Sequence, residues 1–442
     1  MKVATARTLD PPPLRRVARA GLLSLGTSVA MQGLNVISGV ALARTLGPAG
    51  RGELAAVLLW PGILAGVGGL SVAEGVAYFT ARDAMPVRAT AATALAISTA
   101  QALLLVAVGY LMMPVLLGHY GARAVFEGRL YMAALPLLLL GGAGVAILLG
   151  KQQWVMVNLV RVAVTAVIVG GLIVLLGQHR LTVLSATWVY VTATLLGFAL
   201  PVGVVAARGW LGARPDRSLV RPVMTFGLKA HVGNMAGQAN LNLDKMAIAT
   251  FLAPRDLGLY SVAVTLSSPL TLIGSSIGFV ALPAVAACAS PVERRQQFAW
   301  LVRSALLLSV ATTIVLVLLT PVLIRFFFGA AFVPGVVVAQ VTIAASLARG
   351  VGYVLGYGLC AFEKPLVPSV AELVAVLITV VGLAALLPAM GLVGAAVTSL
   401  LAYTTGAGVM LWFARSRLGI GLADLLVPRA HDVVHWMSCL RP

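Results

Sequence analysis

The residues best suited to chemistry form a polar stripe within a long apolar stretch, from about Thr225 to Tyr260. Five hydrogen-bonding side chains recur there at spacings of three, four, four and three: His231, Asn234, Gln238, Asn242 and Lys245. This period places all five on one face of a single helix. An ionised side chain at the membrane centre costs about 2.5–3.5 kcal/mol even on mild scales, so the stripe must face protein or water. We therefore interpret it as the wall of a polar substrate cavity.

Seven ionisable residues fall inside the predicted membrane spans: Arg161, Lys229, Lys245, Arg349, Glu74, Asp244 and Glu372. The cations could bind an anionic substrate, arginine as a bidentate fork and lysine as a point charge. Lys229 and Lys245 lie near the ends of their helix and could instead extend to the membrane surface. Each acid could bind a coupling proton or sodium ion, or could equally hold two helices together by a salt bridge or hydrogen bond.

The composition identifies a membrane protein. Of 442 residues, 60% are hydrophobic and 10% are charged, and the mean hydropathy is +1.01. Soluble domains carry about 25% charged residues, so a polytopic membrane protein is predicted. Almost no length remains for a separate soluble domain.

Twelve apolar segments reach the ~20 residues that a helix needs to cross the hydrocarbon core. They centre on residues 21–42, 54–80, 89–117, 130–149, 154–176, 182–206, 223–250, 258–287, 298–324, 333–358, 366–388 and 392–414. The prediction is an all-α protein of two six-helix bundles, residues 21–206 and 222–414, joined by a cytoplasmic linker at 207–221. Basic tails at 1–20 and 415–442 complete the chain.

The distribution of charge predicts the orientation. The formal net charge is +18, which could suggest a nucleic-acid partner, but most of the 31 lysines and arginines fall on the side of the two termini. This bias predicts that both termini are cytoplasmic. Topology and attraction to anionic lipid explain the basic excess, so no nucleic acid is expected. The three cysteines show no ligand spacing, and neither a metal nor a cofactor is expected.

The N-terminal part of the chain is similar in sequence to the region that contains the stripe. Shifting the sequence by 206 superimposes seven identical residues, at Ala30, Gln32, Ala41, Ala43, Leu46, Pro48 and Gly52. The shift spans six predicted helices, so the two halves share one orientation and are related by an axis along the membrane normal. Gln32 and Asn35 are then expected to face the stripe across a central cleft. A duplication whose polar groups serve only helix packing remains the alternative.

The residues that carry this repeat also resemble a known family. The segment ALARTLGPAGRGELA (41–55) is similar to the arginine, Leu-Gly-Pro and glycine pattern of the polysaccharide (O-antigen) flippases, within the multidrug/oligosaccharidyl-lipid/polysaccharide (MOP) exporter superfamily. The stretch 226–270, with Asp244, resembles the start of that family's second half, and GLVGAAVTSLLAY (391–403) its last span.

The resemblance implies two helical bundles in a V around a central cavity, and alternating access. It also implies export of an undecaprenyl-pyrophosphate-linked oligosaccharide across a bacterial inner membrane, for O-antigen, exopolysaccharide or capsule assembly. The implied partners are that lipid-linked oligosaccharide and membrane lipids, with a glycan polymerase and export machinery as further candidates.

Two other functions remain open. A multidrug extrusion antiporter of the same superfamily would favour cationic drugs and an acidic cavity. An integral-membrane glycan polymerase or acyltransferase would need a large loop with clustered Arg, His or Asp on the far side, where the predicted loops are short. The G-x-S-x-G match at 274–278 lies in an apolar helix rather than after a strand, so no catalytic site is expected.

Overall fold

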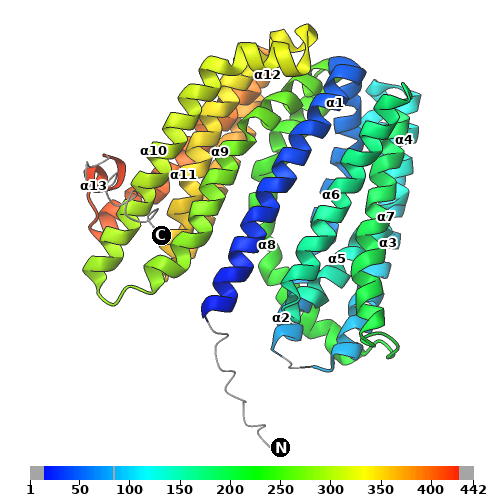
Figure 1. The fold of residues 1–442 in the computed structure, drawn as a ribbon, viewed down its shortest axis with the longest axis horizontal. Coiled ribbons are helices and arrows are strands. Elements are labelled where there is room, and N and C mark those ends of the chain that lie inside the picture. The colour runs from blue at the N-terminus through cyan, green and yellow to red at the C-terminus, as the bar shows by residue number, and fades with distance from the viewer. Residues whose placement is uncertain (1–13, 83–84, 428–442) are drawn as a thin grey trace, which may run out of the picture.

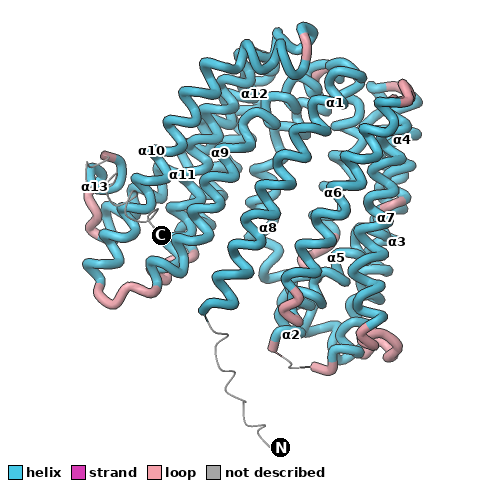
Figure 2. The backbone as a smooth tube through the Cα atoms, viewed as in Figure 1, coloured by secondary structure: helices cyan, strands magenta, loops and turns pink. Residues whose placement is uncertain are grey.

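The computed structural model describes residues 14–82 and 85–427, and in this part the chain is helical, with no strand (Figures 1 and 2). The first half holds α1 (Leu14–Gly68), α2 (Val72–Ala81), α3 (Val87–Leu117), α4 (Ala122–Ala133), α5 (Leu135–Gly150), α6 (Trp154–Gly177) and α7 (Val183–Ala207). The second half holds α8 (Arg217–Phe251), α9 (Pro254–Ala286), α10 (Pro291–Leu323), α11 (Val336–Ala361), α12 (Leu366–Leu418) and α13 (Leu422–Leu426). Three short turns, η1 (Gly118–Tyr120), η2 (Ile324–Phe328) and η3 (Ala330–Gly335), join neighbouring helices.

The chain crosses the membrane twelve times, as the sequence predicts. Nine helical segments in the described ranges are long and apolar enough to span a bilayer. Two of them reverse direction at a glycine of positive φ: α1 at Gly47 (φ 64°) and α12 at Gly391 (φ 55°). Only glycine adopts such angles without strain, and Pro48 then suits the first turn of the next helix. Counting these two helices twice and adding the polar α8 gives twelve crossings.

The helices form two bundles that diverge toward the end at which α1 begins (Figure 1). One bundle contains α1–α7 and the other α9–α12, and α8 lies between them. The bundles meet at the opposite end, where α1 packs against α9. The predicted fold class, all-α with two bundles in a V, is confirmed.

The closed end of the V is a backbone contact between equivalent positions of the two repeats. A Cβ built on Gly52 would lie 1.7 Å from the carbonyl oxygen of Pro254, and one built on Gly258 would lie 1.9 Å from that of Pro48. The shift of 206 pairs Pro48 with Pro254 and Gly52 with Gly258. The contact is therefore symmetric, and it gives a physical reason why both halves have glycine at this position.

The helix α8 bridges the bundles. Its first turns lie on α2, where a Cβ on Gly75 would come within 2.6 Å of the Val223 carbonyl oxygen. Phe226 stacks on Tyr78 of α2, with ring centroids 4.3 Å apart. Its later turns pack against α12 of the second bundle. The start of the second repeat is thus attached to the first bundle, and its polar stripe runs along the space between the two.

Candidate functional site

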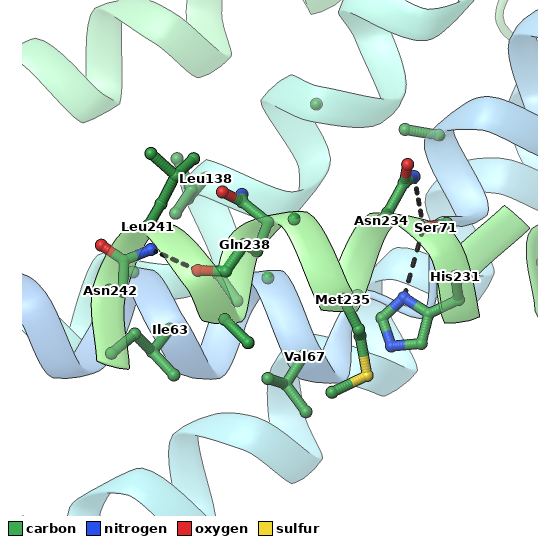
Figure 3. Close-up of a pocket in the computed structure, with 18 of the residues that line it drawn as sticks. Ile63, Val67, Ser71, Leu138, His231, Asn234, Met235, Gln238, Leu241 and Asn242 are labelled. Atoms are coloured by element: carbon green, nitrogen blue, oxygen red, sulfur yellow. Dashed lines mark hydrogen bonds between the residues drawn. The ribbon is translucent and has the colours of Figure 1, made fainter. Parts of the chain in front are cut away.

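A cavity of about 1010 Å³ lies between the bundles (Figure 3). Its wall is formed by the part of α1 that follows the break at Gly47, together with parts of α2, α3, α5, α8, α11 and α12. Four of the five stripe residues line it: His231, Asn234, Gln238 and Asn242. The stripe therefore faces a polar space between the bundles, while apolar side chains such as Ile63, Val67 and Leu138 complete the wall.

Hydrogen bonds connect the stripe to α2 of the first bundle. His231 is buried and shares a 3.2 Å hydrogen bond between its Nδ1 and the Ser71 hydroxyl. The Asn234 Nδ2 donates to the Ser71 hydroxyl at 3.1 Å and to the Glu74 carboxylate at 2.9 Å. Further along, the Asn242 Nδ2 donates to the Gln238 carbonyl oxygen at 3.0 Å (Figure 3). The first two residues of the stripe thus link α8 to the first bundle, and the later amides face the cavity.

The second membrane span is broken where it meets the cavity. The sequence predicts one helix over residues 54–80, but α1 ends at Gly68 and α2 begins at Val72. Leu70 and Ser71 between them have φ of 49° and 50°. Non-glycine residues rarely adopt this left-handed region. The break directs Ser71 and Glu74 toward α8, and no proline marks it in the sequence.

Arg349 of α11 occupies the junction of three cavities. It lines the main cavity and two smaller ones, of about 240 and 320 Å³, whose walls come mainly from α8 and the second bundle. Its Nε and Nη2 donate to the Tyr353 hydroxyl at 3.3 and 3.2 Å. Its guanidinium carbon lies 4.7 Å from the centroid of the Tyr403 ring. Two tyrosines therefore hold the guanidinium at the cavity wall, one by hydrogen bonds along its Nε–Nη2 edge and one by its ring face.

Glu372 of α12 belongs to the same wall. Its Oε2 accepts a 2.6 Å hydrogen bond from the Asn240 Nδ2. The Thr379 hydroxyl donates to the Asn240 Oδ1 at 3.3 Å, and the Tyr403 hydroxyl donates to the Asn240 carbonyl oxygen at 3.1 Å. This network attaches the later turns of α8 to α12 and fixes Glu372 close to Arg349.

Asp244 lies inside the second bundle, beside the cavity of about 320 Å³. It is 5% exposed and accepts hydrogen bonds from the Tyr260 hydroxyl, from the Ser399 hydroxyl at 3.3 Å and from the Lys245 amide at 2.7 Å. The Lys245 Nζ lies 3.5 Å from the Asn242 Oδ1. Among the side chains that the structure describes, no cation pairs with Asp244, whose carboxylate is held by neutral donors.

The other candidate residues lie away from the main cavity. Gln32 lines the cavity of about 320 Å³ and donates to the Ser268 hydroxyl of α9. Arg161, Lys229 and Asn35 are exposed, and none of them lines the three cavities described above. The sequence predicts that Gln32 and Asn35 face the stripe. Gln32 lines the same cavity as Lys245, the last residue of the stripe, and also contacts α9, whereas Asn35 lines none of the three cavities.

The charges of the main cavity differ from the expected set. Of the four intramembrane cations, Arg349 alone lines it, together with two acids, Glu74 and Glu372. Sequence reasoning missed Tyr353 and Tyr403, which hold Arg349. The spacing of four between Arg349 and Tyr353 on one helix is a signal that could have indicated the first of them.

Comparison with known proteins agrees with this architecture. The sequence matches the model of a family described as polysaccharide biosynthesis protein over residues 41–337. No curated protein matched significantly. Among solved structures, an inward closed form of the lipid II flippase MurJ matches with a TM-score of 0.74 and 15% identity, over 95% of this chain and 93% of that one.

Two further structures have the same fold. An inward-facing multidrug resistance MATE family transporter of the MOP superfamily matches with a TM-score of 0.72 and 13% identity, over 88% of this chain and 94% of that one. A MOP superfamily transporter from Pyrococcus furiosus, described as having a binding pocket of reverse polarity, matches with a TM-score of 0.64 and 14% identity, over 96% of this chain and 99% of that one. The chain belongs to the polysaccharide biosynthesis protein family and has the two-bundle membrane fold of the MOP superfamily.

Proposed function

We propose that this protein is a flippase, which moves an undecaprenyl-pyrophosphate-linked oligosaccharide from the cytoplasmic to the outer leaflet by alternating access. The observation that carries the proposal is the cavity between the bundles, which presents a row of carboxamides and one tyrosine-held arginine. Carboxamides both donate and accept hydrogen bonds, as sugar hydroxyls do. Family membership supports the same substrate class.

The shape suits a cargo with one polar and one apolar end. The glycan would occupy the cavity while the polyprenyl chain stays in lipid between the diverging bundles. A phosphate that reaches Arg349 would meet a guanidinium already oriented by Tyr353 and Tyr403. Such preorganisation reduces the entropy that binding must overcome.

The orientation of this cycle follows from the charge distribution. Arg82, Arg88, Arg208 and Arg217 are exposed at the ends of α2, α3, α7 and α8, on the side where the bundles diverge. With this side in the cytoplasm of a bacterial inner membrane, the cavity would be in its loading state. Asp244, which neutral donors hold inside the protein, is a candidate for binding a coupling ion.

A cation-coupled multidrug extruder is the second candidate. The presence of Glu74 and Glu372 in the main cavity, against Arg349 alone, favours a cationic substrate. The four cations and three acids that the sequence predicts inside the membrane would instead have favoured an anionic substrate. We infer a transporter rather than an enzyme, because the solved structures that share this fold are described as a flippase and as transporters.

The test is the fate of lipid-linked glycan in a deletion strain. Spheroplasts would be treated with an impermeant glycan-cleaving reagent, with and without a plasmid carrying the wild-type chain or its Arg349→Ala variant. A flippase predicts full-length lipid-linked units that accumulate shielded from the reagent, and rescue by the wild-type chain but not by the variant. Units that reach the outer leaflet and fail only to polymerise would support an enzyme. Unchanged units with raised sensitivity to cationic drugs would support the extruder.

A further inference from the structure

The walls of the cavity differ in how their charges are balanced. On the second bundle, Glu372 accepts from Asn240 and lies within electrostatic reach of Arg349, so its charge has a cation nearby. On the first bundle, Glu74 is exposed to the cavity and accepts a hydrogen bond from the neutral Asn234 amide. Among the side chains that the structure describes, none forms an ion pair with Glu74. The wall formed by α2 therefore presents a carboxylate that has no ion-pair partner among the described side chains.

The groups near Glu74 recognise neutral ligands. Ser71, Ser98 and Gln101 of the first bundle line the same cavity, facing Gln238 and Asn242 of α8. Hydroxyl and carboxamide groups pair equally well with sugar hydroxyls and N-acyl groups. A carboxylate accepts strongly from hydroxyl or ammonium donors, but it repels another carboxylate. A glycan beside α2 would thus meet hydroxyl and carboxamide groups, which donate and accept hydrogen bonds. The charged group on α2 that it would meet is the Glu74 carboxylate.

We propose that the transported glycan is uncharged, or carries an amino sugar, in the part that meets α2, and that Glu74 excludes acidic sugars. This inference rests on the proposed flippase function and specifies its substrate class. Arg349 and Glu74 would then recognise different parts of the substrate. The arginine serves the phosphate end, whereas the carboxylate selects neutral saccharide over uronate. Specificity of this kind comes from a repulsive element as well as from attractive contacts.

The experiment compares two substrates that differ in a single group. Purified protein in proteoliposomes would be supplied with polyprenyl-pyrophosphate disaccharides that end in glucose or in glucuronate, each with a fluorophore that an impermeant quencher reduces. The loss of protected signal measures flipping. The expected preference for the glucose form is about tenfold or more, since a like charge a few ångströms away in a partly hydrated cavity removes a decade of affinity.

Two variants assign the preference to Glu74. Glu74→Gln retains the size and the hydrogen-bond acceptor but not the charge, and should reduce the preference to within about threefold. Glu74→Asp retains the charge and should retain the preference, even if its overall rate falls. Glu293→Gln removes the same charge from the exposed first turn of α10, away from the cavity, and should leave the preference unchanged.

The outcomes separate the inference from the function. If the wild-type protein flips both disaccharides equally or prefers glucuronate, the inference is wrong and the flippase stands. If Glu74→Gln keeps the full preference, another residue makes the selection and Glu74 does not. If neither disaccharide moves faster than in protein-free vesicles while a cationic dye is transported, the flippase proposal itself fails.

Discussion

Different kinds of contact hold the two ends of the space between the bundles: close backbone packing at one end and side-chain hydrogen bonds at the other. At the closed end, backbone meets backbone at Gly52 and Gly258, surrounded by an apolar core to which both bundles contribute. Nearer the open end, α2 and α8 are joined by side-chain hydrogen bonds through Ser71 and Glu74. Close packing responds steeply to a single methyl group, whereas polar contacts can exchange with water at little net cost. We call the closed-end contact of Gly52 and Gly258 the gate, and we expect it to tolerate less change than the polar contact nearer the open end.

Symmetry separates the two ends as well. The gate is built from equivalent residues of the two repeats, Pro48 with Gly52 and Pro254 with Gly258. Two side chains flank it in the same manner. Arg44 Nε donates to the Phe327 carbonyl oxygen at 2.8 Å, and His119 Nε2 lies 2.9 Å from the Ala249 carbonyl oxygen. The cavity has no such symmetry, because its stripe belongs to α8 while Gln32, the counterpart of Gln238, faces a different cavity. The repeat is thus retained where the halves pack and lost where a ligand would bind.

The largest effect is expected from a methyl group at the gate. Gly52→Ala gains about 0.5–1 kcal/mol of helix propensity. It places a Cβ 1.7 Å from the Pro254 backbone oxygen, which no rotamer change can relieve. Overpacking of this kind costs about 3 kcal/mol. Thermal unfolding should show a fall in melting temperature. Spin labels at the exposed Phe126 and Val333 should report a longer distance across the closed end.

The matched control for the gate is Gly203→Ala in α7. An added Cβ there meets no atom within 4 Å. The melting temperature should stay the same or rise slightly, since alanine is the better helix former. Equal melting temperatures of Gly52→Ala and Gly203→Ala would contradict the close packing inferred at the gate.

The next effect is expected at the cavity, from Arg349. Its replacement by alanine removes the half-buried cation, and replacement by lysine removes the planar guanidinium that Tyr353 and Tyr403 hold. Loss of a charge-assisted contact costs about 2 kcal/mol, or roughly thirtyfold in affinity. Binding of a polyprenyl pyrophosphate to the detergent-solubilised protein should weaken by that factor in Arg349→Ala, with little recovery in Arg349→Lys. Full recovery by lysine would show that charge alone matters there.

A smaller effect is expected at the polar contact between α2 and α8. His231→Ala removes the hydrogen bond to Ser71, worth about 1 kcal/mol. Hydrogen exchange of the α2 amides should become faster, while amides near Gly52 keep their protection. His179→Ala, in the exposed turn between α6 and α7, is the matched control and should change neither region. Faster exchange at the gate in His231→Ala would mean that the two ends are not independent.

The sequence predicted the fold better than the site, for physical reasons. Twelve spans follow from hydropathy, because a backbone in lipid has few options besides a helix. The stripe on α8 was predicted because helical period alone decides which of its residues share a face. The break at Leu70 and Ser71 was missed: no glycine occupies its two positive-φ positions, and the one signal in the sequence is Gly68-Gly69 directly before them. The place of Arg161 was equally undetermined: hydropathy locates a charge along the membrane normal but gives no rotation of its helix.

The smallest effect is expected where α8 begins, outside the membrane. Asp216 caps this helix: its carboxylate accepts from the Ser218 amide at 2.8 Å and from the Ser218 hydroxyl at 2.7 Å. These hydrogen bonds hold the pKa of Asp216 below its ordinary value. A carboxyl group whose pKa is lower in the folded state stabilises the fold above the unfolded pKa, and this contribution disappears as the pH falls through the folded pKa. The cap should therefore stabilise α8 at neutral pH and less so below about pH 4.

Because Asp216 is fully exposed, solvent screens its charge and the effect must be small. Asp216→Ala should lower the melting temperature by about 1 °C at pH 7, and Asp216→Asn by less, since asparagine is also a good cap. The difference between wild type and Asp216→Asn should shrink as the pH approaches 4, because the charge is then lost from the wild type. A difference that does not change with pH would assign the cap to hydrogen bonding alone. In that case, the charge of Asp216 would contribute nothing, and the packing of Phe226 and Val223 on α2 would be the main contact that holds the start of α8 to the first bundle.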